Sequence, residues 1–226
     1  MIDLEFEQAI AAPPVMIPEF DGIRRYGVRD SKRYLAKIRP GEFFVTRHGE
    51  LISTTLGSCV AACVRNRITG VGGMNHFLLP DSFEGNTKLW EETLVSAPAR
   101  YGNVAMERLI NVVLGDKARR EDLEIKVFGG AKVLRANIDI GERNTLFVKS
   151  YLRTEGLMIA AQDLGGTAPR KVIYDPVNGD VFVRKLGSGV KSRIVEEEFD
   201  HLKTIKDDEV SGDVDLFTTD DGWESI

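Results

Sequence analysis

Both cysteines of the chain and one of its three histidines lie in a single apolar, glycine-containing stretch between Thr55 and Pro80. Cys59 and Cys63 supply the thiols, and His76 supplies an imidazole. A free thiol is mostly protonated at neutral pH, and a neighbouring imidazole that accepts its proton leaves a nucleophilic thiolate. These residue types therefore indicate nucleophilic attack on a carbonyl carbon as the chemistry to consider first.

Contact between Cys59 and His76 depends on the pairing of two β-like runs that flank a polar turn, residues 59–66 and 71–79. With a four-residue loop beginning at Asn66, the numbers of opposed residues sum to 135, which places Cys59 opposite His76. Their Cβ atoms would then lie roughly 4.5–5.5 Å apart. A loop one residue longer places Phe77 opposite Cys59, and a bulge at the glycine pair of the second run redirects the histidine. The spacing permits the contact without requiring it.

The residues before the first cysteine fit the same chemistry. Gly57 removes a side chain near the sulfur and lets a planar carbonyl approach the backbone, and the N–H groups around Ser58 can donate to an oxyanion. An imidazole that acts as a base is usually held by a third group. Hydroxyls suited to that task stand just upstream, at Ser53, Thr54 and Thr55.

The alternative to catalysis is ordinary packing, because cysteine often behaves as a small buried hydrophobe. We interpret Cys63, between Ala62 and Val64, as a packing residue. For Cys59 and His76, composition alone leaves catalysis and packing about equally open. A metal site lacks a ligand, since two cysteines and one histidine provide three donors, and Cys-x-x-x-Cys on a strand suits a metal poorly. The remaining histidines, His48 and His201, are expected to be exposed and without a role.

The elements that must position these residues are short strands and two helices. Helical spacing of apolar residues predicts helices over residues 100–115 and 141–156, each ending at a glycine. Strands are expected within residues 41–59, where two are joined at His48–Gly49, within 123–131 and 157–166, and as a hairpin over 170–186. Residues 81–99 are expected to form a loop. This mixture predicts an α+β fold in which helices cover one face of β-structure.

Composition and charge narrow the class of protein. No apolar run reaches about 18 residues, so no membrane span is expected, and the acidic N-terminus lacks the features of a secretory signal. Two closely spaced cysteines make no disulfide framework, which favours a reducing cytoplasm. The net charge is −5, but residues 196–226 hold twelve acidic and two basic residues. That segment is expected to be a solvated, flexible extension, and the mild positive charge elsewhere is too diffuse to indicate nucleic-acid binding.

Several blocks of the chain, in order, resemble the CheD family of bacterial chemoreceptor glutamine deamidases. They are "STTLGSCVAACVRNRITGVGGMNHFLLP", "RYGNVAMERLINVVL", "VFGGAKVL", "IGERNTLFVKSYLRTEGL" and "DLGGTAPRKVIYDPVNGDVFVRKL". The resemblance implies a three-layer α/β/β sandwich, similar to the deamidase domains of certain bacterial toxins. It divides the chain into an N-terminal arm and lead-in at 1–37, a catalytic domain at 38–187 and an acidic, flexible tail at 188–226.

The resemblance also implies an activity, which is hydrolysis of specific glutamine side chains on methyl-accepting chemoreceptors to glutamate, with release of ammonia. The family's catalytic cysteine and histidine fall on Cys59 and His76, and its third residue, a hydroxyl, falls on Ser53, with Thr54 adjacent. No metal or cofactor is implied, and the chemotaxis phosphatase CheC is a suggested partner. Two other functions remain open, a non-catalytic adaptor that binds receptors or a phosphatase, and a different thiol acyl-transfer enzyme such as a protease.

Overall fold

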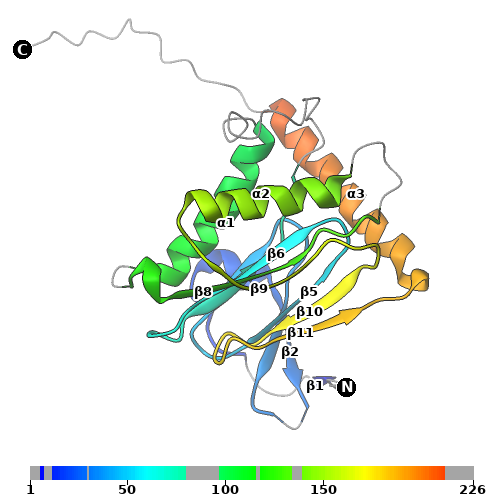
Figure 1. Cartoon of the computed structure of the whole chain (residues 1–226). Coiled ribbons are helices and arrows are strands. Elements are labelled where there is room, and N and C mark those ends of the chain that lie inside the picture. The colour runs from blue at the N-terminus through cyan, green and yellow to red at the C-terminus, as the bar shows by residue number, and fades with distance from the viewer. Residues whose placement is uncertain are drawn as a thin grey trace, which may run out of the picture.

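The computed structural model describes residues 6–7, 12–29, 31–79, 97–115, 118–133 and 139–211. Within these ranges the chain forms two β-sheets and three α-helices (Figure 1), which confirms the predicted α+β fold. The expected loop at 81–99 lies outside the described residues except for its last three positions, which begin a helix. Residues 212–226 of the acidic tail also lie outside them.

The first sheet has six strands, and β5 (Leu51–Leu56) lies inside it. This strand pairs in parallel with β3 (Tyr34–Lys37) and antiparallel with β10 (Arg170–Tyr174). The predicted hairpin at 170–186 is confirmed, since β10 pairs antiparallel with β11 (Val181–Lys185). The sheet is completed beyond β3 by β2 (Arg24–Val28) and β1 (Phe6–Glu7).

The second sheet has five strands, and β6 (Val60–Asn66) lies at its centre. One neighbour is β7 (Gly72–Asn75), which pairs in turn with β4 (Phe43–Thr46), and the other is β8 (Leu123–Gly129), which pairs with β9 (Ile159–Leu164). Strand β6 is apolar along most of its length because both of its faces are covered. The six residues of β6 other than Arg65 are buried.

Two helices cover the outer face of the second sheet (Figure 1). They are α1 (Ala97–Leu114) and α2 (Ile140–Thr154), which confirm the helices predicted at 100–115 and 141–156. Helix α2 begins after Asp139, whose carboxylate accepts the Glu142 N–H at 3.1 Å. Two short 3₁₀ helices lie at Pro18–Gly22 and Arg120–Asp122. The order of helices, second sheet and first sheet is the predicted three-layer α/β/β sandwich, and one apolar core joins the layers.

The N-terminal segment is more ordered than the arm expected at 1–37. Strands β2 and β3 extend the first sheet, and Tyr34, Leu35 and Ala36 are buried. They are held because β3 pairs with the interior strand β5. The division of the chain at residues 37 and 187 stays a prediction, but residues 24–37 are part of the sheet.

The expectation of a flexible tail is wrong for residues 188–211, which form helix α3 (Ser188–Ser211). Ile194 and Glu198 are 4% and 1% exposed, and His201 is half-buried. These positions are four and three residues apart, so they share one face of the helix. His201 was expected to be exposed and is not, whereas His48 is exposed as expected. Among the described side chains of α3, the buried face holds one apolar residue, Ile194, and one such residue carries too little hydrophobic signal to stand out in an acidic sequence.

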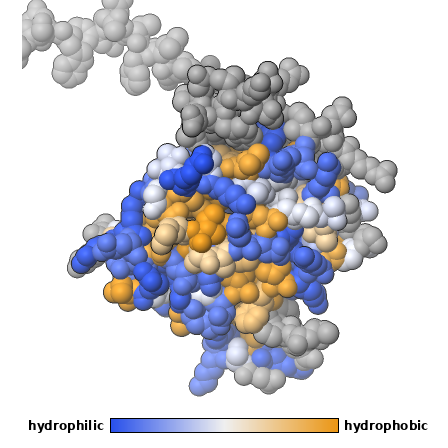
Figure 2. Space-filling view, in the orientation of Figure 1, coloured by the Kyte–Doolittle hydropathy of each residue, from blue (hydrophilic) through white to orange (hydrophobic). Residues whose placement is uncertain are grey.

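The surface mixes polar and apolar residues on the face shown in Figure 2. Exposed apolar side chains occur singly among polar ones, for example Met158, Val177 and Phe182, which is usual for a folded protein. Among the helices in the described ranges, none has both the length and the apolar character needed to cross a membrane.

Candidate active site

The register of β6 and β7 differs from the predicted one and still places the key residues on one face. Opposed residues are Cys63 with Met74 and Val60 with Phe77, so their numbers sum to 137. The loop has four residues, as predicted, but begins one position later, because the Asn66 N–H bonds to the carbonyl of Val71. This register sets His76 across from Ala61, and Cys59 lies two residues along the same face of β6.

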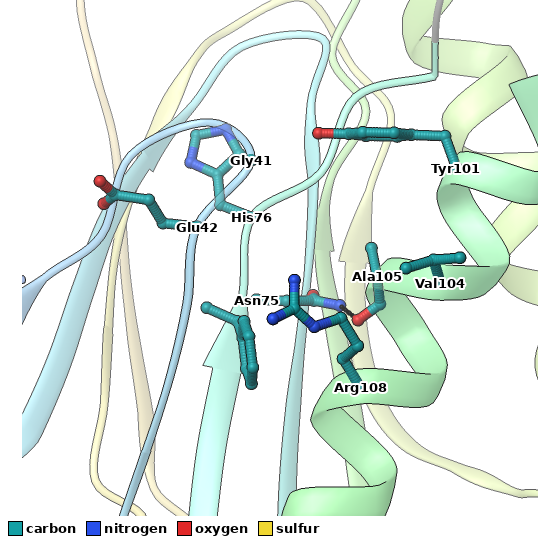
Figure 3. A pocket seen from close by; sticks show the side chains of 9 residues that line it. Gly41, Glu42, Asn75, His76, Tyr101, Val104, Ala105 and Arg108 are labelled. Carbon is teal, nitrogen blue, oxygen red and sulfur yellow. Dashed lines mark hydrogen bonds between the residues drawn. The ribbon is translucent and has the colours of Figure 1, made fainter. Parts of the chain in front are cut away.

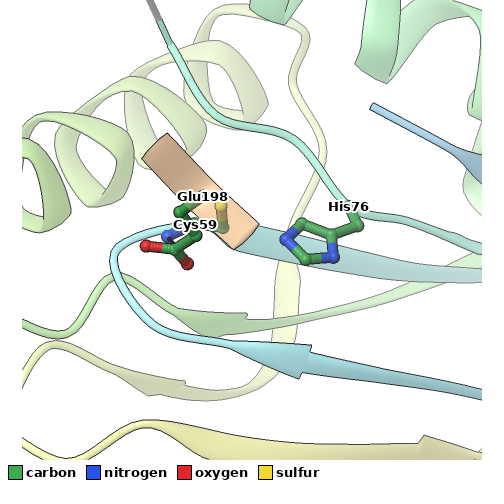
Figure 4. Close-up of side chains that lie close together, drawn as sticks. All are labelled: Cys59, His76 and Glu198. Carbon is green, nitrogen blue, oxygen red and sulfur yellow. Dashed lines mark hydrogen bonds between the residues drawn. The ribbon is translucent and has the colours of Figure 1, made fainter. Parts of the chain in front are cut away.

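Cys59 and His76 meet in the space between the two sheets, at the end where β6 begins and β7 ends. Both side chains are buried, at 0% and 1% exposure. The Cys59 sulfur, a ring nitrogen of His76 and a carboxylate oxygen of Glu198 all lie within 4.8 Å of one another (Figure 4). The sequence did not place Glu198 in this group.

Thr54, rather than Ser53, holds the imidazole. The Thr54 hydroxyl lies 2.7 Å from His76 Nδ1 and donates its proton to the carbonyl of Ile38 at 2.9 Å. A hydroxyl has one proton, so it must accept from Nδ1–H, and Nε2 is then the unprotonated nitrogen. Nε2 has no hydrogen-bond partner. Ser53, the position implied by the family resemblance, is the neighbour of Thr54 on β5, and successive strand residues point to opposite faces.

The bend that precedes β6 presents a set of backbone N–H groups to the same space. The carbonyl groups of the bend are also bound. The Gly57 carbonyl accepts from the Ala131 N–H at 2.8 Å, and the Cys59 carbonyl accepts from the Gly130 N–H at 2.7 Å. The Ser58 carbonyl accepts from the side-chain amide of Asn144 at 2.8 Å. The N–H groups of the same three residues converge on the Glu198 carboxylate. The donors expected near Gly57 and Ser58 are therefore arranged to bind one anionic group.

Glu198 fills that position completely. Its Oε1 accepts from the N–H groups of Gly57 and Cys59 at 2.8 and 3.1 Å. Its Oε2 accepts from the N–H and hydroxyl of Ser58 at 2.9 and 2.6 Å. Gly57 is needed for this approach, because a Cβ at that position would lie 2.9 Å from both oxygens. The site thus binds a planar, two-oxygen group next to a thiol.

Burial sets the resting protonation of the pair. It raises the pKa of the Cys59 thiol well above its usual value, and the charge and hydrogen bond of Glu198 raise it further. Burial also lowers the pKa of His76 to about 3, with a smaller effect from the nearby His201. The pair therefore rests as a neutral thiol and a neutral imidazole while Glu198 is in place.

The pH dependence of Cys59 alkylation should show the effect of Glu198 on the pKa of the thiol. Replacing Glu198 with alanine removes a negative charge and admits water, and both changes favour the thiolate. The pKa of Cys59 falls, so the midpoint of its reaction with iodoacetamide should move to lower pH than in the unchanged chain. Glu197→Ala, on the exposed side of α3, is the matched control and should leave the midpoint in place. Equal midpoints for Glu198→Ala and the unchanged chain would contradict this electrostatic account.

A metal ion is a weaker fit to the site. Cys59, His76 and Glu198 offer three atoms of types that bind zinc. Three backbone N–H groups and the Ser58 hydroxyl point their hydrogens at the same carboxylate. Donors of that sign stabilise an anion or a carbonyl oxygen and repel a cation, so the donor set favours an acyl group.

His76 also lines a small pocket on the side of α1. The pocket has a volume of about 70 Å³ and lies between the turn at Gly41–Phe43 and the helix residues Tyr101 and Arg108 (Figure 3). The turn is fixed to the histidine, since the Gly41 N–H donates to the His76 carbonyl at 2.8 Å and the His76 N–H donates to Glu42 at 2.9 Å. A pocket of this size holds water molecules.

Comparison with known proteins identifies the family of the chain. The family model CheD, described as CheD chemotactic sensory transduction, matches residues 78–185. A relative from Hahella chejuensis, named probable chemoreceptor glutamine deamidase CheD, is 44% identical over 205 residues, which is 91% of this chain and 95% of that protein. A relative of the same name from Halorhodospira halophila is 50% identical over 204 residues, 90% of this chain and 94% of that one. The chain belongs to the CheD family.

Two residues of this CheD family member contact the bend although the sequence patterns did not predict their roles. Asn144 is buried on α2 and joins two strand ends, because it also accepts the Leu79 N–H at 3.0 Å. For Asn144, the sign in the sequence was a polar residue on an otherwise apolar face of the helix. Glu198 gave none, since it stands in a run of three glutamates.

Thr54 should affect turnover more than Ser53. Thr54→Val removes the hydrogen bond to His76, and a neutral hydrogen bond is worth roughly 0.5–1.5 kcal/mol, which corresponds to a loss of kcat of about two- to thirteenfold. Ser53→Ala, on the other face of β5, is the control and should cost less. Thr54→Ser should restore most of the loss, and KM should change little throughout. A larger loss from Ser53→Ala than from Thr54→Val would return the orienting role to Ser53.

Asn144 should matter for stability. Asn144→Ala leaves the Ser58 carbonyl and the Leu79 N–H without partners, and an unsatisfied buried group costs roughly 1–3 kcal/mol. We expect the free energy of unfolding in urea to fall by at least this amount. Asn111→Ala, an exposed asparagine on α1, should change it by less than about 0.5 kcal/mol. Similar values for the two variants would show that Asn144 does not support the bend.

Proposed function

We propose that this chain hydrolyses the side-chain amide of glutamine residues on methyl-accepting chemoreceptors, giving glutamate and ammonia. Its relatives carry the name chemoreceptor glutamine deamidase. The observation that carries the proposal is the Glu198 carboxylate held by three backbone N–H groups beside Cys59 and His76. A site that binds the γ-carboxylate of a glutamate beside a thiol is suited to a reaction that converts a glutamine side chain to glutamate.

Acylation follows from the geometry. His76 Nε2 takes the Cys59 proton, and the sulfur bonds to the Cδ carbon of the glutamine. The carbonyl electron pair moves to oxygen, where the N–H groups of the Gly57–Cys59 bend stabilise it. The oxygen then re-forms its double bond, the C–N bond breaks, and the imidazolium gives its proton to the departing ammonia. Thr54 keeps the ring in one tautomer during these transfers.

Deacylation uses the same groups. His76 takes a proton from a water molecule, whose oxygen attacks the thioester carbon. The C–S bond breaks, the sulfur recovers the proton, and glutamate is released. The net reaction converts an amide and water to a carboxylate and ammonium. Each event adds one negative charge to a receptor helix, which changes repulsion between neighbouring side chains.

The proposal extends to the cellular compartment and to a protein partner. Both cysteines are free thiols, which fits the reducing cytoplasm expected for the protein. Binding to a CheC phosphatase remains a prediction from the family resemblance. An adaptor function would need neither the buried thiol nor the oriented imidazole.

The test is mass spectrometry of a chemoreceptor cytoplasmic fragment after incubation with the full chain. A gain of about one mass unit at a glutamine, absent with Cys59→Ala, is expected for an amide converted through the thiol. Cleavage of the fragment would indicate a protease instead. An unchanged fragment, including with a chain that carries Glu198→Ala to open the site, would favour the adaptor.

A further inference from the structure

Helix α3 closes the site with residues of the face that holds Glu198. Ile194, Glu198 and His201 face the body, and His201 meets the Tyr101 hydroxyl at 3.3 Å. The exposed residues of α3 include Arg193, Glu196, Glu197, Asp200 and Lys203. Ile194 is the buried apolar anchor among the α3 side chains that the structure describes.

The side chain at the centre of this contact is the residue type that the proposed reaction makes. Glu198 reaches the bend with its γ-carboxylate, and its Oε1 accepts from the N–H groups of Gly57 and Cys59, the donors that would receive the substrate's carbonyl oxygen. Its carboxylate lies within 4.8 Å of the Cys59 sulfur and of the His76 ring. Figure 4 shows the three side chains converging, with Glu198 entering from the helix.

A simple plug would not need this chemistry. A buried carboxylate costs free energy unless every lost hydration contact is replaced, and an apolar side chain would close the same opening without that requirement. Here four donors are used for the carboxylate, while His76 Nε2 is left buried without a partner. That nitrogen is the group expected to take a proton from the thiol once a substrate amide is in place.

We propose that α3 is a built-in competitor of the receptor, in which Glu198 occupies the position of the substrate's glutaminyl side chain. The proposal rests on the deamidase function above and adds its regulation and the form of its substrate. Because Glu198 enters from a helix, the opening accepts a glutamine presented by a helix, such as one on a receptor bundle. Receptor binding must displace α3, so the apparent affinity is lowered by the fraction of chains that are closed.

The decisive variant is Glu198→Gln in the full chain. If position 198 takes the substrate's place, the introduced amide is attacked by Cys59 and hydrolysed. Peptide mass spectrometry should show a gain of about one mass unit at position 198. Conversion should be first order, at a rate that does not depend on protein concentration, because the reaction is intramolecular.

Two control variants test whether Cys59 and the placement of residue 198 cause the conversion. Adding Cys59→Ala to Glu198→Gln should stop the conversion, which separates it from spontaneous deamidation. Glu197→Gln lies one residue away on the exposed side of the same helix and should stay unconverted. Conversion at both positions, or conversion without Cys59, would overturn the proposal.

A second variant tests the competition. Glu198→Ala should speed deamidation of a receptor fragment by at least about tenfold, because charge-assisted contacts that hold the closed state are lost. Conversion of Glu198→Gln together with this acceleration supports the proposal. Persistence of the amide while the receptor fragment is deamidated would overturn the substrate mimicry and leave the proposed function standing. Failure of both reactions would overturn the proposed function as well.

Discussion

Cys59→Ala is expected to reduce deamidation of a receptor fragment to the background rate. The substitution removes the atom that forms the thioester, and no other thiol can replace it. Cys63 lies four residues along β6, about 13 Å away at 3.3 Å per residue. Burial raises the pKa of Cys63 above its usual range, as it does for Cys59, so the distance of Cys63 from the bend is what sets the two thiols apart.

Cys63→Ala is the matched control, because it is the same substitution on the same strand in a similarly buried position. It should keep most of the activity, while mass spectrometry of the deamidated fragment and thermal unfolding are followed for both variants. Both proteins should unfold cooperatively at similar temperatures. Full activity of Cys59→Ala together with inactivity of Cys63→Ala would reverse the assignment of the nucleophile.

His76→Asn is expected to lower kcat by about 10²–10⁴-fold, the usual contribution of general acid–base catalysis. Asparagine can still bond to the Thr54 hydroxyl, but it cannot take the thiol proton or return a proton to ammonia. The effect should exceed that of Thr54→Val, which leaves the imidazole in place and removes only its support.

The residual activity of His76→Asn should rise with pH, because without the imidazole base only the spontaneously ionised thiol can attack. Steady-state kinetics between neutral and alkaline pH would measure this. His201, which lies close enough to affect the pKa of His76, provides the comparison through His201→Asn, and a small effect is expected there. A larger loss from His201→Asn than from His76→Asn would show that His76 is not the general base.

Local pattern was enough to predict much of the fold. The helices over residues 100–115 and 141–156 and the hairpin at 170–186 follow from apolar periodicity and turn residues, which depend on near neighbours in the chain. The register of β6 and β7 was predicted wrongly, because it depends on whether Asn66 joins the strand or the turn. In the structure its side chain accepts the N–H groups of Ile68 and Thr69, while its own N–H joins the strand ladder.

The site was only partly predictable, because some of its residues are brought together by the tertiary fold rather than by local pattern. Cys59, His76 and the donors near Gly57 lie within one stretch of sequence, so their types and spacing point to one chemistry. The choice between Ser53 and Thr54 depends on which face of β5 meets the second sheet, and that is a tertiary property. Glu198 lies 139 residues from Cys59 in an acidic run that suggested a solvated tail. Its role is visible only once α3 is placed over the bend.

The most direct test of covalent catalysis through Cys59 is the mass of the target glutamine when hydroxylamine competes with water. A thioester is attacked by either nucleophile, so two enzyme-dependent products are expected, glutamate and a hydroxamate that is heavier than glutamine by about 16 mass units. The share of hydroxamate should rise with hydroxylamine concentration and vanish with Cys59→Ala. Glutamate as the sole product at every hydroxylamine concentration would contradict a thioester intermediate and, with it, the role assigned to Cys59.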